Sequence, residues 1–371
     1  MSSKQSAREF LGRDLGPEAL LLLLCARTAM SDDLAAQISK LAQAPRLDWD
    51  ALADMADKHR VTQLLFRNLS AICPEAMPTA TRVRLRHQFF TNAGFNLKLA
   101  DALLSLLEVF DAEGIPVLPF KGGVLAHCTY GKLAWRQYYD IDLLVDHGDR
   151  ARSEALLKSQ GFVCDETFDR ELRFRRVDDD VEVDLHWAFA PRYFYHSVEF
   201  GELFERAQVV DFQGHEIRTL SPEDFLLVLC LQVVKDSWER RQQLEHVSKV
   251  CDIAEHVRAH PDLDWTRVMR EARGAGLRRT VLCALRLSRE LLATELPPRV
   301  LKAVESDDRA LKAAKNMCRS LFTDDDTLSP LDNPYLSLSL RMRQLRFYLG
   351  VRERYRDRIR HIAEILRPGR P

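Results

Sequence analysis

The chain has 371 residues, with 54 lysine and arginine residues against 55 aspartate and glutamate residues, so its formal net charge is −1. This balance excludes a global electrostatic attraction to nucleic acid or to an anionic membrane. The length is sufficient for about two or three domains with a sizeable core.

The cysteines and the one long apolar stretch indicate an intracellular protein. Eight cysteines are scattered without a C-x-x-C pair, a spacing that favours buried free thiols over a zinc site or a disulfide framework. The apolar residues 19–26 follow Asp14 and Glu18 and are too few to span a bilayer. We therefore expect a core helix there, a cytoplasmic location and no membrane partner.

Residues 1–112 carry helical patterns throughout. Ser31 and Asp48 each precede such a pattern at a position where their side chains can cap a helix. From Thr79 to Ala112 apolar residues recur at helical spacing, and the sequence 114–116, Gly-Ile-Pro, ends that stretch. An N-terminal helical region is therefore expected.

A phosphate-binding turn is predicted next. Residues 115–120 form a short apolar strand pattern that leads into Lys121, Gly122 and Gly123, and a helix-like segment begins at Val124. Paired glycines at a strand-to-helix turn let backbone N–H groups approach an anion, and the helix N-terminus favours negative charge. Lys121 adds a positive charge for a phosphate oxygen.

Two later segments, 140–145 and 181–187, alternate polar and apolar residues, which is typical of strands with one polar face. The polar residues that share a face are Asp140 and Asp142 in the first segment and Glu182, Asp184 and His186 in the second. If the strands pair, the carboxylates converge and need a cation to ionise together. Oxygen ligands favour Mg²⁺, which binds carboxylates together with substrate phosphates.

Several of these residues also have a purely structural interpretation. Glu182 could be a fourth ligand, a base or an edge-strand surface residue. His186 could orient Asp184 through a hydrogen bond, or it could be a satisfied histidine beside Trp187. Arg136 precedes the first acid by four residues and could bind a phosphate through two hydrogen bonds.

The remaining elements follow from turn residues and periodicity. A helix is expected over 148–159 and a strand from 161. Strands at 172–175 and 181–188 flank a solvated acidic turn at 178–180, and a hairpin is expected over 209–220. Ser221 and Pro222 then begin a second helical region.

Two basic clusters in this last region leave alternatives open. Lys235, Asp236, Trp238, Arg240 and Arg241 are expected in a loop after a helix at 222–234, either as cleft residues that hold a substrate or as a solvated connection. The arginine-rich run at 341–360 could bind nucleic acid, or it could form a helix that packs its apolar stripe and points its arginines toward acidic partners.

The sequence resembles a known family at the motif residues, which are Lys121-Gly122-Gly123, Arg136, the run 140–145 and the run 183–187. It is similar to the bacterial uncharacterised nucleotidyltransferase family, within the superfamily typified by DNA polymerase beta. The resemblance covers most of the chain and is most specific over 115–188. It implies a mixed sheet with three acidic metal ligands, which match Asp140, Asp142 and Asp184.

Two departures from the superfamily pattern stand out. Lys121 occupies the place of the usual apolar residue before the first glycine. The interval between Gly123 and Asp140, residues 124–139, contains sixteen residues and is longer than the common spacing. A longer site loop is therefore expected.

Together these observations predict an α+β fold with a small mixed sheet. The expected regions are an N-terminal helical region at 1–112, a nucleotidyltransferase core at 113–220 and a C-terminal helical region at 221–371. The expected reaction moves a nucleoside monophosphate from a nucleoside triphosphate, with ATP as the expected donor, to an acceptor hydroxyl, and it releases pyrophosphate. Two Mg²⁺ or Mn²⁺ ions are expected, one to activate the hydroxyl and one to offset charge on the pyrophosphate.

The acceptor could be a small molecule, a protein side chain or an RNA end. The alternative is a non-catalytic nucleotide-binding or interaction module with the same fold, which a complete set of three acids disfavours. A metal-dependent phosphohydrolase is a further alternative. Such sites commonly use several histidines, and only His186 is in phase here.

Overall fold

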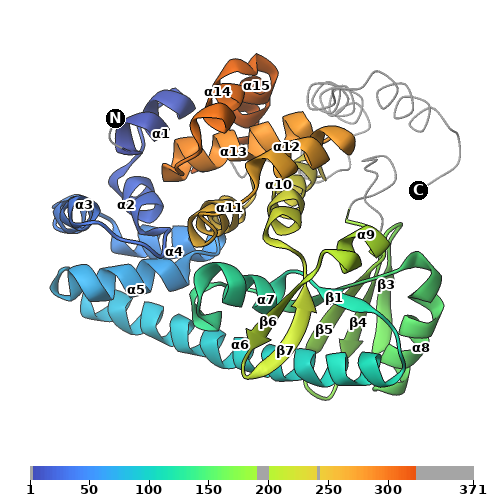
Figure 1. Cartoon of the computed structure of the whole chain (residues 1–371). Coiled ribbons are helices and arrows are strands. Elements are labelled where there is room, and N and C mark those ends of the chain that lie inside the picture. The colour runs from blue at the N-terminus through green and yellow to red at the C-terminus, as the bar shows by residue number, and fades with distance from the viewer. Residues whose placement is uncertain (1–2, 190–199, 240–242, 323–371) are drawn as a thin grey trace, which may run out of the picture.

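The computed structural model describes residues 3–189, 200–239 and 243–322, in an α+β arrangement that confirms the predicted fold class (Figure 1). Arg240, Arg241 and the arginine-rich run at 341–360 lie outside these residues. In the described part of the chain, no helix has both the length and the apolar character needed to cross a membrane.

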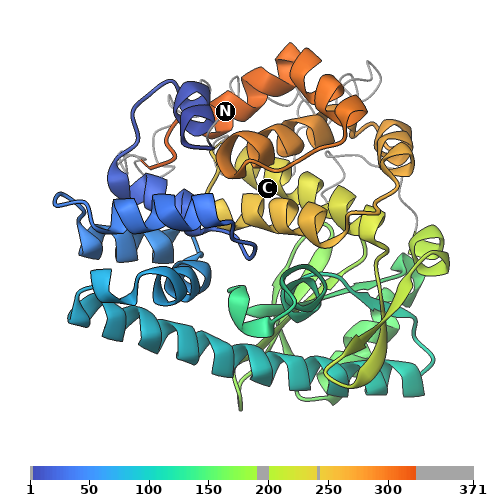
Figure 2. The same ribbon diagram turned by 60° about the vertical axis from the view of Figure 1, so that its left-hand side comes forward.

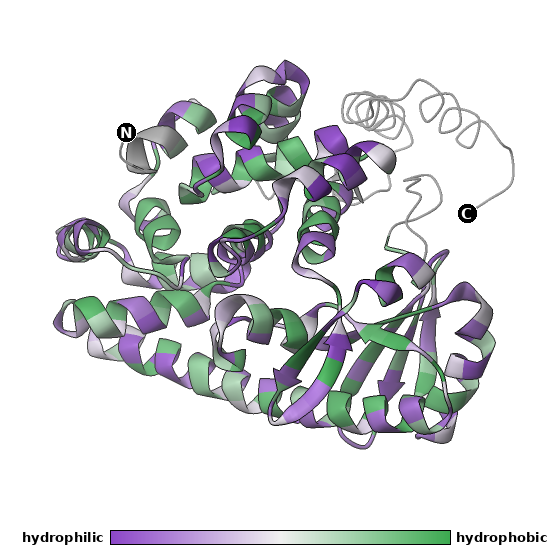
Figure 3. Ribbon diagram, viewed as in Figure 1, coloured by the Kyte–Doolittle hydropathy of each residue, from purple (hydrophilic) through white to green (hydrophobic). Residues whose placement is uncertain are grey.

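Six α-helices precede the first strand. They are α1 (Ser3–Leu11), α2 (Pro17–Cys25), α3 (Asp32–Ala42), α4 (Trp49–Lys58), α5 (Thr62–Ile72) and α6 (Thr79–Ala112). The Ser31 hydroxyl accepts a hydrogen bond from the Leu34 N–H at 3.3 Å, and Asp48 accepts two from the first turn of α4. Both predicted N-caps are thus confirmed. The apolar stretch forms α2, which is buried over its length from Ala19 to Cys25 and is hydrophobic in Figure 3.

The 34-residue helix α6 lies along both the N-terminal helices and the sheet (Figure 2). Its bounds are those predicted from the apolar spacing. Two of the apolar residues in the stretch, Val83 and Phe90, are nevertheless 61% and 59% exposed. Its buried Asn92 and Asn96 donate hydrogen bonds to the Arg136 carbonyl at 3.4 and 2.9 Å. The helix therefore holds the loop that leads into the second strand.

The main sheet has five strands in the order β1-β2-β5-β4-β3. Only β2 and β5 are parallel, and the other neighbours are antiparallel, so the sheet is mixed as predicted. The strands are β1 (Val117–Pro119), β2 (Asp140–Val145), β3 (Val163–Thr167), β4 (Glu171–Arg176) and β5 (Val181–His186). A separate hairpin of β6 (Gln208–Phe212) and β7 (His215–Thr219) confirms the hairpin expected over 209–220.

Short helices connect the strands. They are α7 (Gly122–Leu125), a π-helix (Ala126–Tyr130), 3₁₀ turns (Leu133–Trp135 and His147–Asp149), α8 (Arg150–Ser159) and α9 (Phe200–Glu205). Along β2 and β5 the residues alternate between two faces of the sheet. Ile141, Leu143, Val183 and Leu185 are buried in the core, and the polar residues of the two strands face the other side.

The second helical region contains α10 (Pro222–Glu239), α11 (Val247–Ala259), α12 (Trp265–Gly274), α13 (Arg278–Leu292), α14 (Pro298–Ser306) and α15 (Asp308–Met317). Lys235 and Asp236 lie within α10, so the predicted loop at these residues is wrong. The predicted helix ended at 234, but Lys235 and Ser237 are buried as well, so the packed face of the helix continues past that residue. Helix α13 packs against α1 and α2, and helices from the two ends of the chain therefore share one core (Figure 1). The region boundaries at 112 and 220 stay predictions.

Candidate active site

Asp142 and Asp184 lie opposite each other on the parallel strands β2 and β5. Both are buried, with exposed fractions of 4% and 6%. Because neighbouring strands are only about 4.8 Å apart, two carboxylates on one face at the same level repel unless cations surround them. The polar alternation predicted this convergence, and the parallel pairing produces it.

His186 joins this pair. Its Nε2 lies 2.9 Å from Asp142 Oδ1, whereas the sequence suggested a bond to Asp184. One ligand atom from each of Asp142, Asp184 and His186 lies within 4.8 Å of the others, and all three side chains are buried. Buried carboxylate and imidazole donors at this spacing fit a divalent cation.

Asp140 lies two residues before Asp142 on the same face of β2 and is not one of the three residues of this cluster. It is opposite Glu182 in the sheet, and both side chains keep some exposure. Burial and the carboxylates of Asp142 and Asp184 raise the pKa of Asp140 to about 7. The structure thus places all three predicted acids on one face of the sheet, and Asp142 and Asp184 are the two that belong to the ligand cluster.

Lys121 is the direct cationic partner of Asp142. Its Nζ lies 2.7 Å from Asp142 Oδ1. Burial alone would raise the pKa of Asp142, but Lys121 and His186 outweigh it and hold that pKa well below the ordinary range. Burial likewise opposes the charge on Lys121, and Asp142 reverses this and raises the pKa of the ammonium group. Both groups are therefore charged at neutral pH.

Gly122 and Gly123 form the first turn of α7, beneath the start of β2. Gly122 has a φ of +51°, and a Cβ at this position would lie 2.8 Å from the Asp140 carbonyl oxygen. A Cβ at Gly123 would lie 3.1 Å from the Tyr138 hydroxyl. The turn therefore needs Gly122 so that Lys121 can lie close to β2.

Arg136 bonds to a residue that the sequence analysis did not single out. Its Nε and one terminal nitrogen donate to the two oxygens of Asp252 on α11, at 2.8 and 3.0 Å. The Tyr130 hydroxyl also donates to Asp252, at 2.7 Å. Burial opposes the charge on Arg136, but Asp252 raises the pKa of the guanidinium. This contact joins the site loop to the C-terminal helices, and a lone acid within the apolar run 250–254 was its only signal in the sequence.

Strand β4 supplies two further charged residues on the same polar face. Glu171 is opposite His186, and its Oε2 lies 2.8 Å from His186 Nδ1, in a contact that is closer to an ion pair than to a well-aligned hydrogen bond. Arg173 is opposite Asp184 and donates to its Oδ1 at 3.1 Å. Burial would lower the pKa of His186, but its contacts with Asp142 and Glu171 raise it. The alternation around 172–175 could have indicated both residues.

Lys235 lies near these groups at the C-terminal part of α10. It is 4% exposed, and its Nζ lies 3.2 Å from Asp236 Oδ1. Lys249 of α11 lies 2.6 Å from Asp236 Oδ2. Burial would raise the pKa of Asp236, but Lys235, Lys249 and Lys121 together lower it. Three ammonium groups from three elements are thus close enough to act on one carboxylate.

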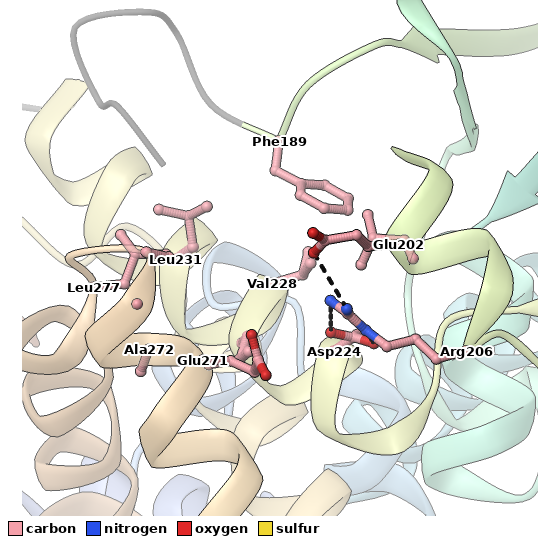
Figure 4. A pocket seen from close by; sticks show the side chains of 13 residues that line it. Phe189, Glu202, Arg206, Asp224, Val228, Leu231, Glu271, Ala272 and Leu277 are labelled. Atoms are coloured by element: carbon pink, nitrogen blue, oxygen red, sulfur yellow. Dashed lines mark hydrogen bonds and ion pairs between the residues drawn. The ribbon is translucent and has the colours of Figure 1, made fainter. Parts of the chain in front are cut away.

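A cavity of about 230 Å³ lies between α9, α10 and α12 (Figure 4). Phe189 lines it and also packs on Phe120, the residue before Lys121, with ring centroids 5.2 Å apart. Within the cavity Arg206 binds Asp224 at 2.8 Å and lies 3.5 Å from Glu202. The charge of Arg206 in the cavity is therefore balanced by the carboxylates of Asp224 and Glu202.

Comparison with known proteins gives a family and distant structural likenesses. The model of a family described as "Uncharacterised nucleotidyltransferase" matches residues 45–293, which include every candidate site residue. No curated protein matches the sequence. The solution structure of the antibiotic-resistance factor ANT(2'')-Ia is 17% identical, with 48% of this chain and 91% of that chain covered and a TM-score of 0.35.

Two crystal structures are similarly distant. That of ANT(2'')-Ia in complex with adenylyl-2''-tobramycin is 16% identical, covers 56% of this chain and 97% of that chain, and has a TM-score of 0.27. That of an antigenic nucleotidyltransferase-like protein from Paracoccidioides brasiliensis is 16% identical, covers 58% and 92% of the two chains, and has a TM-score of 0.33. These values are too low to support an inference about substrate or mechanism.

Proposed function

Because the chain belongs to the uncharacterised nucleotidyltransferase family, we propose that it moves a nucleoside monophosphate from a nucleoside triphosphate to an acceptor hydroxyl, with a divalent cation bound at Asp142 and Asp184. The observation that carries this proposal is the placement of these two buried acids side by side on parallel strands. Asp140, two residues earlier on the same face, completes the proposed set of acids.

The cation would be Mg²⁺ or Mn²⁺, with two ions during turnover. Such ions lower the pKa of a bound hydroxyl and offset charge on transferring and leaving phosphates. Asp142 supports this role because it is ionised in a buried position and already has two nitrogen neighbours, Lys121 Nζ and His186 Nε2. A carboxylate in that setting can exchange one cationic partner for another without leaving a bare buried charge.

Lysines are the proposed triphosphate ligands. If Lys121 gives up Asp142 when an ion binds, its ammonium can turn to a phosphate oxygen. In this proposal Lys235 and Lys249, which share Asp236, add positive charge close to Lys121, whose charge also acts on Asp236. The Gly122–Gly123 turn brings Lys121 to this position, and backbone contact of the turn with the phosphates is part of the proposal.

The reaction would form a bond from the acceptor oxygen to the α-phosphorus and break the bond from that phosphorus to the oxygen bridging to the β-phosphate. Pyrophosphate leaves with the bond electrons. The hydroxyl proton needs an acceptor, and Asp140 is the proposed one, because it keeps some exposure at the start of β2, where an acceptor hydroxyl can approach it. Glu182, opposite Asp140, is a second candidate base.

Arg136 has a different proposed role from the one that its spacing suggested. Its guanidinium binds Asp252 through two hydrogen bonds, and its carbonyl accepts hydrogen bonds from α6. We propose that it fixes the loop before Asp140 and thereby positions the acids. ATP is the proposed donor, and the acceptor would be a hydroxyl of a small molecule, a protein or an RNA.

A pair of labels tests this function. The full chain is incubated with a cell extract, Mg²⁺ and ATP that is labelled at either the α- or the γ-phosphorus. The incubation is then repeated with labelled GTP, CTP and UTP in turn. Transfer of the α-label to an acceptor, with none of the γ-label, is expected, and a chelator should abolish it. Transfer of the γ-label would indicate a kinase. Nucleotide binding without transfer of either label would favour the non-catalytic module.

A further inference from the structure

We infer that His186 is itself a ligand of the catalytic ion, held in orientation by Glu171, so that the site selects Mn²⁺ over Mg²⁺ more strongly than carboxylates alone would. This inference rests on the proposed function and extends it to the identity of the ion. It departs from the expectation of a purely acidic ligand set.

The first support is the distance between donor atoms. His186 Nε2 and Asp142 Oδ1 lie 2.9 Å apart, and both belong to the group whose ligand atoms are within 4.8 Å of one another. Two donors about 2.1 Å from one ion, at a right angle, are about 3.0 Å apart. The pair therefore already has the spacing of neighbouring ligands, and the movement that ion binding requires is that of Lys121 away from Asp142 Oδ1.

The second support is the environment of the other ring nitrogen. Metal-binding histidines almost always direct their second nitrogen at a carboxylate, a carbonyl or a water. His186 Nδ1 lies 2.8 Å from Glu171 Oε2, and the exposed fractions of the two residues are 2% and 6%. Glu171 thus lies on the Nδ1 side of the ring, and Nε2 faces Asp142 and the site.

The sheet register explains why this arrangement is specific. Glu171 is opposite His186 across the β4–β5 pair, and Asp142 is on the strand at the other side of β5. The imidazole ring also packs edge to face against Phe120, with ring centroids 5.1 Å apart. The imidazole is thus fixed between two carboxylates and an aromatic ring, and binding of an ion would release the Nε2 proton to solvent.

The consequence concerns ion selectivity. Oxygen donors suit both ions, but Mg²⁺ is a hard ion that is bound almost entirely by oxygen, whereas Mn²⁺ belongs to the first-row transition series and accepts a nitrogen donor more readily. Glu171 would act as a positioning residue, because it reaches the ion only through the ring. Its loss should weaken Mn²⁺ binding about 10-fold to 100-fold, which is the usual range for such outer partners.

Pulsed electron paramagnetic resonance on Mn²⁺ bound to the full chain tests the inference. A ¹⁴N coupling to the ion is expected, and it should change to the ¹⁵N pattern in protein grown on ¹⁵N-histidine. His186→Gln should remove the coupling and lower the ratio of Mn²⁺ to Mg²⁺ affinity about 10-fold. Glu171→Gln should keep the coupling and weaken Mn²⁺ binding. His215→Gln, on the exposed side of the hairpin, is the matched control.

The outcomes separate this inference from the proposed function. Bound Mn²⁺ without nitrogen coupling in the wild-type chain overturns the inference even if His186→Gln fails to fold, and α-label transfer would then leave the proposed function intact. Equal Mn²⁺ affinities for the wild type and a folded His186→Gln variant would also overturn it. Failure of Mn²⁺ to bind at all, with and without nucleotide, would count against both.

Discussion

Lys121 and Asp142 form an ion pair of 2.7 Å between the turn after β1 and the second strand of the sheet. Asp184, on the neighbouring strand, has its own partner in Arg173 at 3.1 Å. Each of the two central acids therefore has a cation of its own from a different element. This arrangement lets two carboxylates stand side by side in a buried position, and it gives Lys121 a partner that a metal ion could replace.

Lys121→Ala should weaken nucleotide binding. If the ammonium turns to a phosphate oxygen, its loss should reduce affinity for Mg²⁺ and ATP by about 1–3 kcal/mol, the range for a charge-assisted hydrogen bond. Titration calorimetry on the folded variant measures this change. Lys132→Ala, an exposed lysine of the same site loop, is the control. Unchanged affinity in a folded Lys121→Ala variant would remove this lysine from the site.

Much of this arrangement could be predicted from the sequence, because it depends on local periodicity. Alternation placed Asp140 and Asp142 on one face of one strand and Asp184 on one face of another, and the glycine turn after a short strand indicated the position of Lys121. The strand and helix patterns indicated helices at either side of the strands, and the family resemblance implied that the sheet is mixed.

The partners across the sheet and between regions could not be predicted, since they depend on register and on long-range packing. His186 contacts Asp142 and Glu171, because β5 lies between β2 and β4. The pairing of Arg136 with Asp252 joins residues 116 positions apart. The loop predicted at Lys235 was wrong, because α10 continues to Glu239 with the polar residues Lys235 and Ser237 buried, which an apolar pattern does not indicate.

Arg136→Ala should destabilise the fold. The change would leave the carboxylate of Asp252, whose side chain is only 5% exposed, without its charged partner. Loss of one member of a buried ion pair costs about 3–5 kcal/mol. Urea unfolding at neutral pH measures the free energy of unfolding. Arg84→Ala removes an exposed pair with Asp54 and should cost about 1 kcal/mol or less. Similar losses in the two variants would contradict the structural role of Arg136.

Asp140→Asn should stabilise the metal-free protein while it slows transfer. The pKa of Asp140 is raised to about 7 by burial and by its acidic neighbours. Between about pH 4 and pH 7 the folded chain keeps a proton that the unfolded chain has lost, so the wild type loses stability as the pH rises through this window. The variant escapes this loss.

The measurement for Asp140→Asn is urea unfolding in the presence of a chelator at pH 4 and pH 8. A gain of about 1–2 kcal/mol is expected at pH 8 and little change at pH 4, with solvent screening of the partly exposed side chain limiting the gain. A variant that is less stable than the wild type at pH 8 would show that Asp140 is not repelled by its neighbours.

Acid should destabilise the protein through buried histidines. Burial lowers the pKa of His256 to about 3 and that of His59 to about 4, from ordinary values near 6.5. Below about pH 6.5 the unfolded chain binds protons that these histidines cannot accept in the folded state. The free energy of unfolding should therefore fall, by about 1.4 kcal/mol per pH unit for each histidine.

Because carboxylates also titrate in this range, the test is a difference between variants. His256→Gln should reduce the slope of stability against pH between pH 6.5 and pH 4.5, and the exposed His215→Gln should not. The same slope in the wild type and in folded His256→Gln would show that this histidine does not contribute to acid sensitivity.

The rate of α-label transfer by Asp142→Asn, compared with the wild type and Asp179→Asn, tests the central claim most directly. Asp179 lies in the turn after β4, where it binds Arg176, and it does not belong to the ligand cluster. Asp179→Asn should therefore keep nearly the full rate. Asp142→Asn should lower the rate by on the order of 10²–10³, because several kcal/mol of transition-state stabilisation are lost with a metal ligand. Equal rates for the two folded variants would contradict the assignment of the site.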